Sequence, residues 1–176
     1  MTIEEPRENR SEPAGGAPAL AGELTHLDAR GAARMVDVSG KEVTVRSATA
    51  SGFVRMASTV VGLLRAEGVP KGDALAVARI AGIQAAKRTP DLVPLCHPIA
   101  IHGVVVDLVV EDDGVRISAT VRTADRTGVE MEALTCVAAA GLTLVDMVKA
   151  VDRGTVITDI RVDEKTGGRS GTWRRS

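Results

Sequence analysis

One acid and one amine interrupt the apolar segment LTLVDMVKAV at residues 142–151. Asp146 and Lys149 are three residues apart, so their side chains would be neighbours on a helix. In water they would form a surface ion pair worth only about 0.3–0.5 kcal/mol. Inside a site, a carboxylate that accepts a proton beside an amine that donates one is suited to general acid–base catalysis. The spacing fits both interpretations.

Two further carboxylates precede the same helical segment. Glu130 and Glu132 flank Met131 in TGVEMEAL, and in extended backbone they point the same way. Acidic residues at a helix N-terminus are stabilised by the helix dipole, and that role requires no function. As a pair inside a site, they could hold the amino and amide nitrogens of a guanine-like ring.

An imidazole lies in a segment that prolines restrict. Residues 89–98, TPDLVPLCHP, contain three prolines and show no regular period, so we expect a loop. Leu95, Cys96 and His97 are consecutive between two of these prolines. A rigid loop can present a histidine as a general acid or base. Cys96 is more typical of a small buried side chain than of a nucleophile.

Several basic residues could bind an anion. Lys71 opens a helical segment, Arg46 follows Val45 in an alternating segment, and the tail DEKTGGRSGTWRR combines Lys165 and Arg169 with three glycines. Glycine lets backbone N–H groups approach an anion, and Lys or Arg supplies charge. The tail lacks P-loop spacing, and a flexible tail is the more common explanation of its composition.

The elements that must position these residues follow from the hydrophobic spacing. Residues 42–50 alternate as in a half-buried strand, and residues 71–88 have helical spacing with Asp73 as N-cap. Residues 51–68 also have helical spacing, with one stripe formed by Phe53, Met56, Val60 and Leu64.

The second half of the chain predicts a hairpin, a helix and a strand. The hairpin covers 99–123 and turns at Asp112-Asp113-Gly114; after the turn one face carries Val115, Ile117, Ala119 and Val121. A helix is expected over 131–152 and a final strand over 155–168. The helix has a wide apolar face of Leu134, Val137, Ala138, Gly141, Leu142, Val145 and Val148.

The resulting order β-α-α-β-β-α-β predicts an α+β fold. Two βαβ-like halves around a hairpin give a ferredoxin-like antiparallel sheet with helices on one face and an extra helix in the first crossover. We expect a single domain over 23–164. Residues 1–22 are rich in Pro, Gly, Glu and Ala, which predicts a disordered tail. Residues 165–176 are predicted to form a Gly-rich basic tail.

Composition excludes several classes of protein. The 176 residues carry a formal net charge of −1, which gives no general attraction to nucleic acid or anionic membranes. Aromatic residues make up only 1%, too few for base-stacking platforms. No apolar stretch in the sequence approaches a membrane span.

The two cysteines, Cys96 and Cys136, are far apart and lack CxxC spacing. We therefore expect reduced thiols and a cytoplasmic protein. The histidines His26, His97 and His102 share no ligand spacing with the cysteines, so we expect no metal site.

Four segments, in order and with matching spacing over roughly residues 24–172, resemble the cyclic pyranopterin monophosphate synthases, the MoaC-type enzymes of molybdenum cofactor biosynthesis. They are LTHLDARGAARMVDVSGKEVTVRSA, KGDALAVARIAGIQAAKRTPDLVPLCHP, TGVEMEALTCVAAAGLTLVDMVKAV and KTGGRSG. The resemblance implies a ferredoxin-like subunit in a homohexamer, a trimer of dimers, with active sites at subunit interfaces.

The implied activity is that of a phosphorus–oxygen lyase. It converts (8S)-3′,8-cyclo-7,8-dihydroguanosine 5′-triphosphate into cyclic pyranopterin monophosphate and pyrophosphate. By resemblance, the step needs no metal or organic cofactor.

The resemblance also implies roles for individual residues. Asp146 matches the family's catalytic aspartate and Lys149 its partner, with Lys71 and His97 in the same pocket. Segments that contact the substrate match Leu95, Cys96, His97, Glu130, Met131 and Glu132. Basic residues that hold the triphosphate match Arg46 and Lys165. The chain departs from the family pattern in its N-terminal extension, at Pro90, and at Arg169, where lysine is common.

Two other functions compete with catalysis. One is a non-catalytic oligomeric module that senses a nucleotide or pterin; the other is an inactive structural subunit. Neither would need all four of Asp146, Lys149, Lys71 and His97. Their joint presence favours the enzyme.

Overall fold

The computed structural model describes residues 30–176, and the chain divides into two compact units, Met1–Arg34 and Met35–Ser176. Every helix and strand of the described residues belongs to the second unit. The tail predicted over 1–22 lies outside the described residues.

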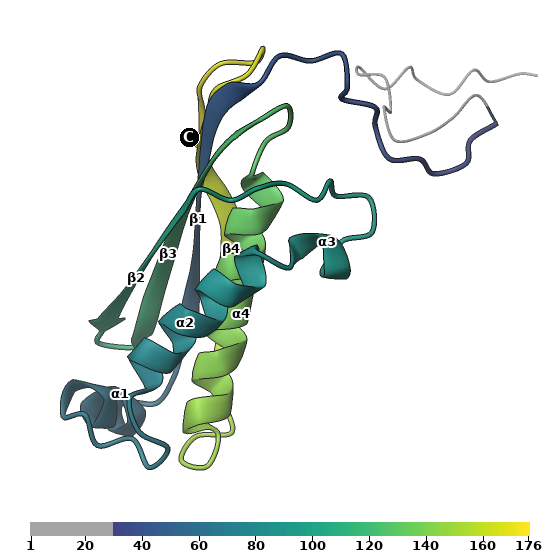
Figure 1. Cartoon of the computed structure of the whole chain (residues 1–176). Helices are drawn as coiled ribbons and strands as arrows, with labels where there is room; N and C mark the ends of the chain where they lie inside the picture. Colours follow the sequence, from purple (N-terminus) through teal and green to yellow (C-terminus); the bar gives the residue numbers. More distant parts are fainter. Residues whose placement is uncertain (1–29) are drawn as a thin grey trace, which may run out of the picture. The chain divides into compact units, whose positions relative to one another are not determined.

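A five-stranded antiparallel sheet forms one layer of the second unit (Figure 1). Its spatial order is β2-β3-β1-β4-β5. The strands are β1 (Thr44–Arg55), β2 (Gly103–Glu111), β3 (Gly114–Asp125), β4 (Val156–Thr166) and β5 (Trp173–Arg174). The first four strands have the ferredoxin-like order, so the predicted fold class is confirmed.

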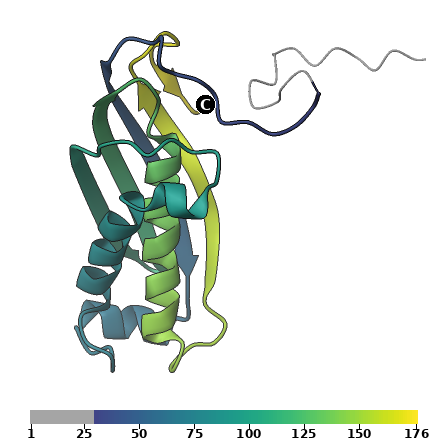
Figure 2. The same ribbon diagram turned by 45° about the vertical axis from the view of Figure 1, so that its right-hand side comes forward.

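The second layer consists of helices on one face of this sheet (Figure 2). Two long helices, α2 (Ala74–Ala86) and α4 (Glu130–Val148), pack against each other, and α4 also contacts β1, β3 and β4. The first crossover holds two more helices, α1 (Ser58–Arg65) and the short α3 (Thr89–Leu92). The extra helix predicted in this crossover is therefore present.

The first strand is longer than its pattern predicted. Residues 51–55 were expected to open a helix but continue β1, and α1 begins only at Ser58. Within this extension Val54 is fully buried in the core, and the Phe53 ring, itself buried, has the guanidinium groups of Arg55 and Arg116 at 5.7 and 5.3 Å from its centroid. Phe53 and Val60 were predicted to lie on one helical stripe, but Phe53 belongs to β1 and Val60 to α1.

Proline did not prevent a helical turn in the segment expected to be a loop. Thr89–Leu92 forms α3 with Pro90 in its first turn. Proline is tolerated there because the first N–H groups of a helix have no intrahelical partner. The prediction of a loop is wrong for these four residues.

The start of α2, the hairpin turn and the buried face of β3 follow their predicted patterns. Asp73 caps α2, since its Oδ1 accepts from the Ala76 N–H at 2.9 Å. The hairpin pairs Glu111 with Gly114 across the predicted turn. The face of β3 that was expected to be apolar is fully buried at Val115, Ile117, Ala119 and Val121.

The buried face of α4 is rotated from the predicted one. It consists of Ala133, Cys136, Val137, Ala140, Gly141, Leu144, Met147 and Val148. Leu142, expected on this face, is 63% exposed, whereas Leu144 is fully buried. The helix also ends at Val148, four residues before its predicted end.

By length and composition α4 could cross a membrane, so the expectation that no segment is long enough is wrong. Half of the apolar window of this helix is buried inside the protein, against the sheet and α2. That burial is typical of a core helix.

Leu144 and Leu142, on the buried and the exposed side of α4, allow a matched pair of substitutions. Leu144→Ala is expected to lower the free energy of unfolding by about 2–5 kcal/mol, because it removes a fully buried side chain and leaves a cavity. Leu142→Ala should cost less than about 1 kcal/mol. Chemical denaturation measures both, and equal losses would contradict the described face of α4.

Candidate active site

Asp146 bridges two amines at the C-terminal end of α4. Its Oδ1 lies 2.6 Å from Lys149 Nζ and its Oδ2 lies 2.8 Å from Lys71 Nζ. Lys71 also donates to the Asp146 backbone carbonyl at 2.8 Å, which fixes the turn before α2 against the end of α4. The structure therefore brings together three of the four residues predicted to be catalytic.

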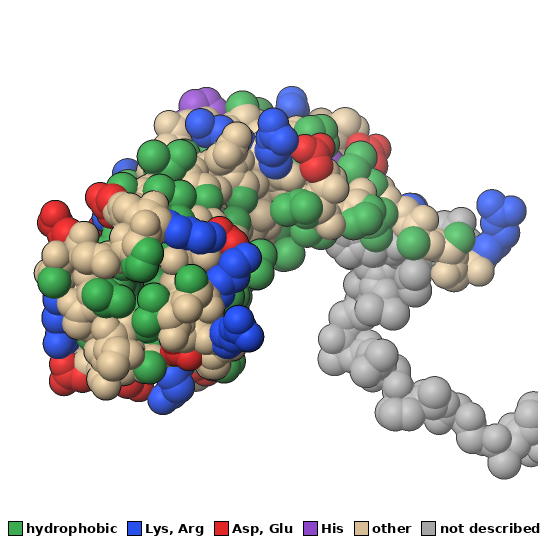
Figure 3. Space-filling model, turned by 90° about the horizontal axis from the view of Figure 1, so that it is seen from below, with side chains coloured by type: hydrophobic (Ala, Val, Ile, Leu, Met, Phe, Trp, Pro, Cys, Tyr) green, Lys and Arg blue, Asp and Glu red, His purple; other side chains and the backbone are tan. Residues whose placement is uncertain are grey.

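This group is open to solvent. The Asp146 side chain is 56% exposed, and Figure 3 views the molecule from this end, where Lys and Arg side chains gather beside acidic ones. Hydrogen bonds from Lys149 and Lys71, in that order, lower the pKa of Asp146 to about 2. The carboxylate is thus ionised at neutral pH. If a substrate drew either amine away, the pKa of the carboxyl would rise.

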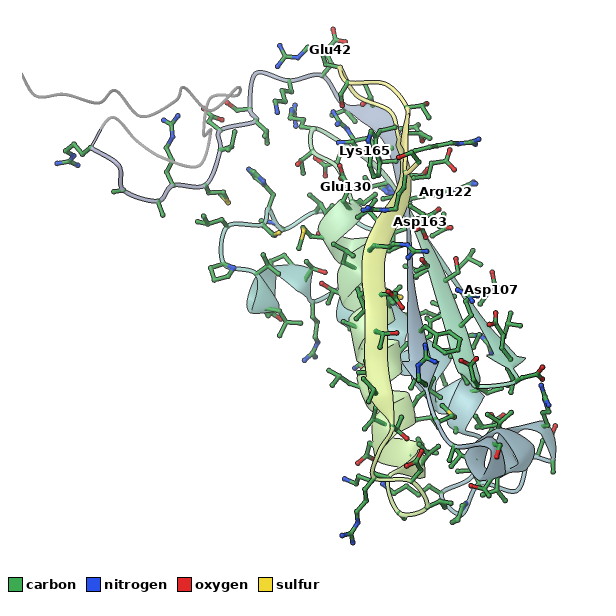
Figure 4. The ribbon with its side chains drawn as sticks, turned by 180° about the vertical axis from the view of Figure 1, so that it is seen from behind. Glu42, Asp107, Arg122, Glu130, Asp163 and Lys165 are labelled. Carbon is green, nitrogen blue, oxygen red and sulfur yellow. The ribbon has the colours of Figure 1, made fainter. Side chains whose placement is uncertain are left out.

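A second group of predicted residues lies at the opposite, N-terminal end of α4. Glu130 Oε1 accepts from Lys165 Nζ of β4 at 2.9 Å, and Figure 4 shows these two side chains adjacent. Glu130 and Glu132 both lie in the first turn of α4, where residues two apart do not face each other, so the expectation that they point the same way is wrong. Met131, between them, is 38% exposed.

Glu132 is a buried carboxyl, only 3% exposed. Burial, with a smaller contribution from the charge of Glu130, raises the pKa of Glu132 to about 6. Such a carboxyl can exchange a proton near neutral pH, unlike Asp146 in its present contacts.

The loop after α3 lies at this same end. His97 Nε2 is 2.7 Å from the Val36 carbonyl oxygen, and because a carbonyl only accepts, Nε2 carries a proton. Nδ1 then carries the lone pair in the neutral ring. No pattern in the sequence indicated this backbone partner, since any residue at position 36 supplies the same carbonyl.

The cysteines are poor nucleophiles in this setting. Partial burial, and next the charge of Glu132, raise the pKa of the Cys96 thiol, and burial raises that of Cys136 to about 12. Reactive cysteines need the opposite shift. Cys96 and the adjacent Leu95 are half-buried, so both remain available for contact with a ligand.

Arg46 is held beside the second group. Its Nε donates to the Asp125 carbonyl oxygen at 2.9 Å, and Arg46 and Lys165 both belong to strand ends at this edge of the sheet. Arg46 forms no ion pair with a carboxylate among residues 30–176.

One chain does not unite the two groups. Sixteen residues separate Glu130 from Asp146 on α4, which at 1.5 Å per residue is about 24 Å. His97 belongs to the Glu130 end, since the neighbouring Cys96 senses the charge of Glu132. The structure thus places His97 far from Lys71, Asp146 and Lys149 of its own chain.

Comparison with known proteins shows the family of the chain. A family model described as the MoaC family matches residues 35–168. The chain belongs to the MoaC family.

Within residues 30–176, no group of three or more His, Cys, Asp or Glu side chains could hold a metal ion.

Curated relatives resemble the chain over nearly its whole length. It is 67% identical to the cyclic pyranopterin monophosphate synthase of Streptomyces coelicolor, over 95% of this chain and 98% of the relative. It is 70% identical to the enzyme of that name from Nocardioides sp., over 86% and 95%. It is 58% identical to cyclic pyranopterin monophosphate synthase 2 of Mycobacterium bovis, over 92% and 96%.

The raised pKa of Glu132 predicts a pH-dependent stability. The folded chain binds this proton more tightly than the unfolded chain, so the stabilising contribution is complete below about pH 4.5 and is lost as the pH rises through about 6. Glu132→Gln stays neutral and should therefore raise the free energy of unfolding above pH 6 but not below pH 4.5.

Chemical denaturation over this pH range tests the expectation. The exposed Glu67→Gln provides the control and should show no such pH-dependent difference. A gain for Glu132→Gln that stays constant with pH would contradict burial as the cause.

Proposed function

We propose that this protein is a cyclic pyranopterin monophosphate synthase. It acts on (8S)-3′,8-cyclo-7,8-dihydroguanosine 5′-triphosphate and yields cyclic pyranopterin monophosphate and pyrophosphate, a step of molybdenum cofactor biosynthesis. The observation that carries the proposal is the identity of 67–70% to enzymes of that name over at least 86% of the chain.

The group around Asp146 supplies proton transfer. Opening and rebuilding the five-membered purine ring requires several transfers, and a carboxylate between two amines can exchange protons with the substrate at either side. When Lys149 or Lys71 turns to the substrate, the pKa of Asp146 rises and its carboxylate becomes a stronger base. Substrate binding therefore activates Asp146 for proton transfer. The three groups titrate as a coupled unit.

The group at the other end of α4 supplies binding and charge stabilisation. In this proposal the carboxyl groups of Glu130 and Glu132 contact the guanine-derived ring from two sides of α4, with Met131, Leu95 and Cys96 as further contacts. Cyclisation forms a bond from a substrate hydroxyl to the α-phosphorus and breaks the bond to the pyrophosphate oxygen. Arg46 and Lys165 stabilise the charge that develops on the leaving group.

The active site is shared between subunits. Because α4 separates its two ends by about 24 Å, a substrate that reaches both Asp146 and His97 must lie between chains. A homohexamer built as a trimer of dimers in the cytoplasm supplies such junctions. His97 of one chain would then act beside Lys71, Asp146 and Lys149 of a neighbour.

Substitutions at the Asp146 group test the activity. Asp146→Asn and Lys149→Ala should each abolish formation of the cyclic pterin and pyrophosphate while leaving assembly intact. The matched control is Asp112→Asn in the hairpin turn, which also removes an exposed carboxylate paired with a basic residue, here Arg65 of α1. If Asp146→Asn turned over the triphosphate at the parent rate, the catalytic assignment would fail.

A mixing experiment tests the shared site. Two inactive variants, Asp146→Asn and His97→Ala, are co-expressed with different tags and purified as mixed assemblies. Sites that combine an intact Asp146 from one chain with an intact His97 from another should restore about a quarter of the parent activity under random mixing. Mixed assemblies as inactive as either variant would place both residues in one chain's site.

A further inference from the structure

Asp152 lies in the turn between α4 and β4 and accepts hydrogen bonds on both of its carboxylate oxygens. Its Oδ2 accepts from the Ala57 N–H at 2.9 Å, and its Oδ1 accepts from the Gly154 N–H at 2.7 Å. These bonds, the one from Ala57 first, lower the pKa of Asp152, so the carboxyl is ionised at neutral pH. Asp152 is therefore an anion that joins two segments 95 residues apart in the sequence.

The partner of Asp152 at this contact, Ala57, is the N-cap residue of α1. This helix has no side-chain cap of its own and no acidic residue in its first turn. The carboxylate of Asp152 accepts from the N-cap backbone N–H, as the glutamate of a capping box does, and places a negative charge at the positive end of the helix dipole. The start of α1 is thus held by a side chain from the far half of the chain.

Asp152 is itself fixed to the C-terminal end of α4. Its backbone N–H donates at 3.0 Å to the carbonyl oxygen of Val148, the last residue of that helix, which is buried. Asp146 and Lys149 belong to this same last turn and contact each other at 2.6 Å. The hydrogen bond from Ala57 therefore ties the start of α1 to the turn that carries the proposed proton-transfer group.

The other end of α1 leads to Lys71. The Gly68 N–H donates to the Leu63 carbonyl oxygen at 2.9 Å, which keeps the segment after α1 against that helix. Lys71 follows this segment and donates to Oδ2 and to the backbone carbonyl of Asp146, each at 2.8 Å. Figure 1 shows α1 and the loop after α4 at the same end of the molecule. Both ends of α1 are therefore attached to the end of α4, through Asp152 before the helix and through Lys71 after it.

We propose that Asp152 is a positioning residue: by fixing the start of α1 to the end of α4, it holds the segment that carries Lys71 within hydrogen-bond distance of Asp146. This role rests on the proposed function, in which Asp146 and its two amines transfer protons. The side chains of Lys71 and Asp146 are 40% and 56% exposed, so water competes for their contact and the placement of the backbone decides it. Asp152 is not part of the buried core, so its link is separable from the fold.

Steady-state kinetics of the full-length protein on the cyclised triphosphate gives the first test. Asp152→Ala should lower kcat about tenfold to a hundredfold per folded chain, because a displacement of about 1 Å at a reacting group costs rate of that order. The KM should stay within about twofold of the parent value, since Asp152 contacts no substrate in this proposal. Asp152→Asn keeps one acceptor oxygen and should fall between the parent and Asp152→Ala.

Ala57→Pro breaks the same link from its other side. The φ of Ala57 is −63°, a value that proline adopts, so the change removes the N–H donor and leaves this φ unchanged. The kcat of Ala57→Pro should fall as far as that of Asp152→Ala, and the double variant should lose no more than either single change. Additive losses would show that the two residues do not act through one hydrogen bond, and the proposal would be wrong.

Lysine labelling reports on Lys71 without turnover. Acetylation by acetic anhydride, read by mass spectrometry of peptides, should label Lys71 about threefold faster in Asp152→Ala and in Ala57→Pro, because its amine is released from Asp146. The exposed Lys87, at the other end of α2, is the internal reference and should react at the parent rate. A general loss of stability would instead raise the labelling of both lysines.

A comparable carboxylate, Asp113, provides the control. Asp113→Ala removes an exposed group that holds the end of β1 through Arg55 and does not reach α4. It should keep the kcat, the KM and the Lys71 labelling of the parent. Parent-like kcat in Asp152→Ala, or a lower kcat with unchanged labelling of Lys71, would overturn the proposal.

Gel filtration and chemical denaturation establish first that each variant folds and assembles. If Asp152→Ala failed to fold, Asp152→Asn and Ala57→Pro would carry the same comparisons, with the same outcomes for and against. Failure of this role and failure of the proposed function are distinguishable. Equal turnover by the parent and the variants removes the positioning role and leaves the proposed function. Faster Lys71 labelling in the variants, with no turnover by the parent, does the reverse.

Discussion

The packing of α4 against both the sheet and α2 is the constraint on which the rest of the structure depends. Its buried face is built largely from small residues such as Ala133, Ala140 and Gly141, which let the helix lie close to both neighbours. Because the helix is rigid and spans about 27 Å, it holds apart two carboxylate–amine pairs, Asp146 with Lys149 at one end and Glu130 with Lys165 at the other. The chemistry at each end is therefore positioned by one element.

Much of this arrangement could be predicted from the sequence because local patterns determined it. The alternation of Val115, Ile117, Ala119 and Val121 placed β3 correctly, and the Asp112-Asp113-Gly114 turn fixed the hairpin. The spacing of Asp146 and Lys149 predicted their contact, although spacing alone left open whether the pair faces a site. The family resemblance added Lys71, whose contact with Asp146 is non-local.

Other features depended on tertiary contacts that no local pattern records. Residues 51–55 have helical spacing, yet pairing with β3 and β4 holds them in β1. Leu142 fits an apolar stripe but is exposed, since the sheet selects a different face of α4. His97 is separated from Asp146 by the length of α4. The acceptor of the His97 hydrogen bond is the backbone carbonyl of Val36, which no side chain marks in the sequence.

The pairing of β5 with β4 gives the protein an internal optical reporter. The chain contains one tryptophan and no tyrosine, and Trp173 lies opposite Lys165 in that pairing. Trp173 is 42% exposed and has the Arg175 guanidinium over its ring at 5.5 Å. Intrinsic fluorescence therefore arises at one known place, the strand beside the basic edge of the sheet, and ligand-dependent changes in emission can be followed there without an attached dye.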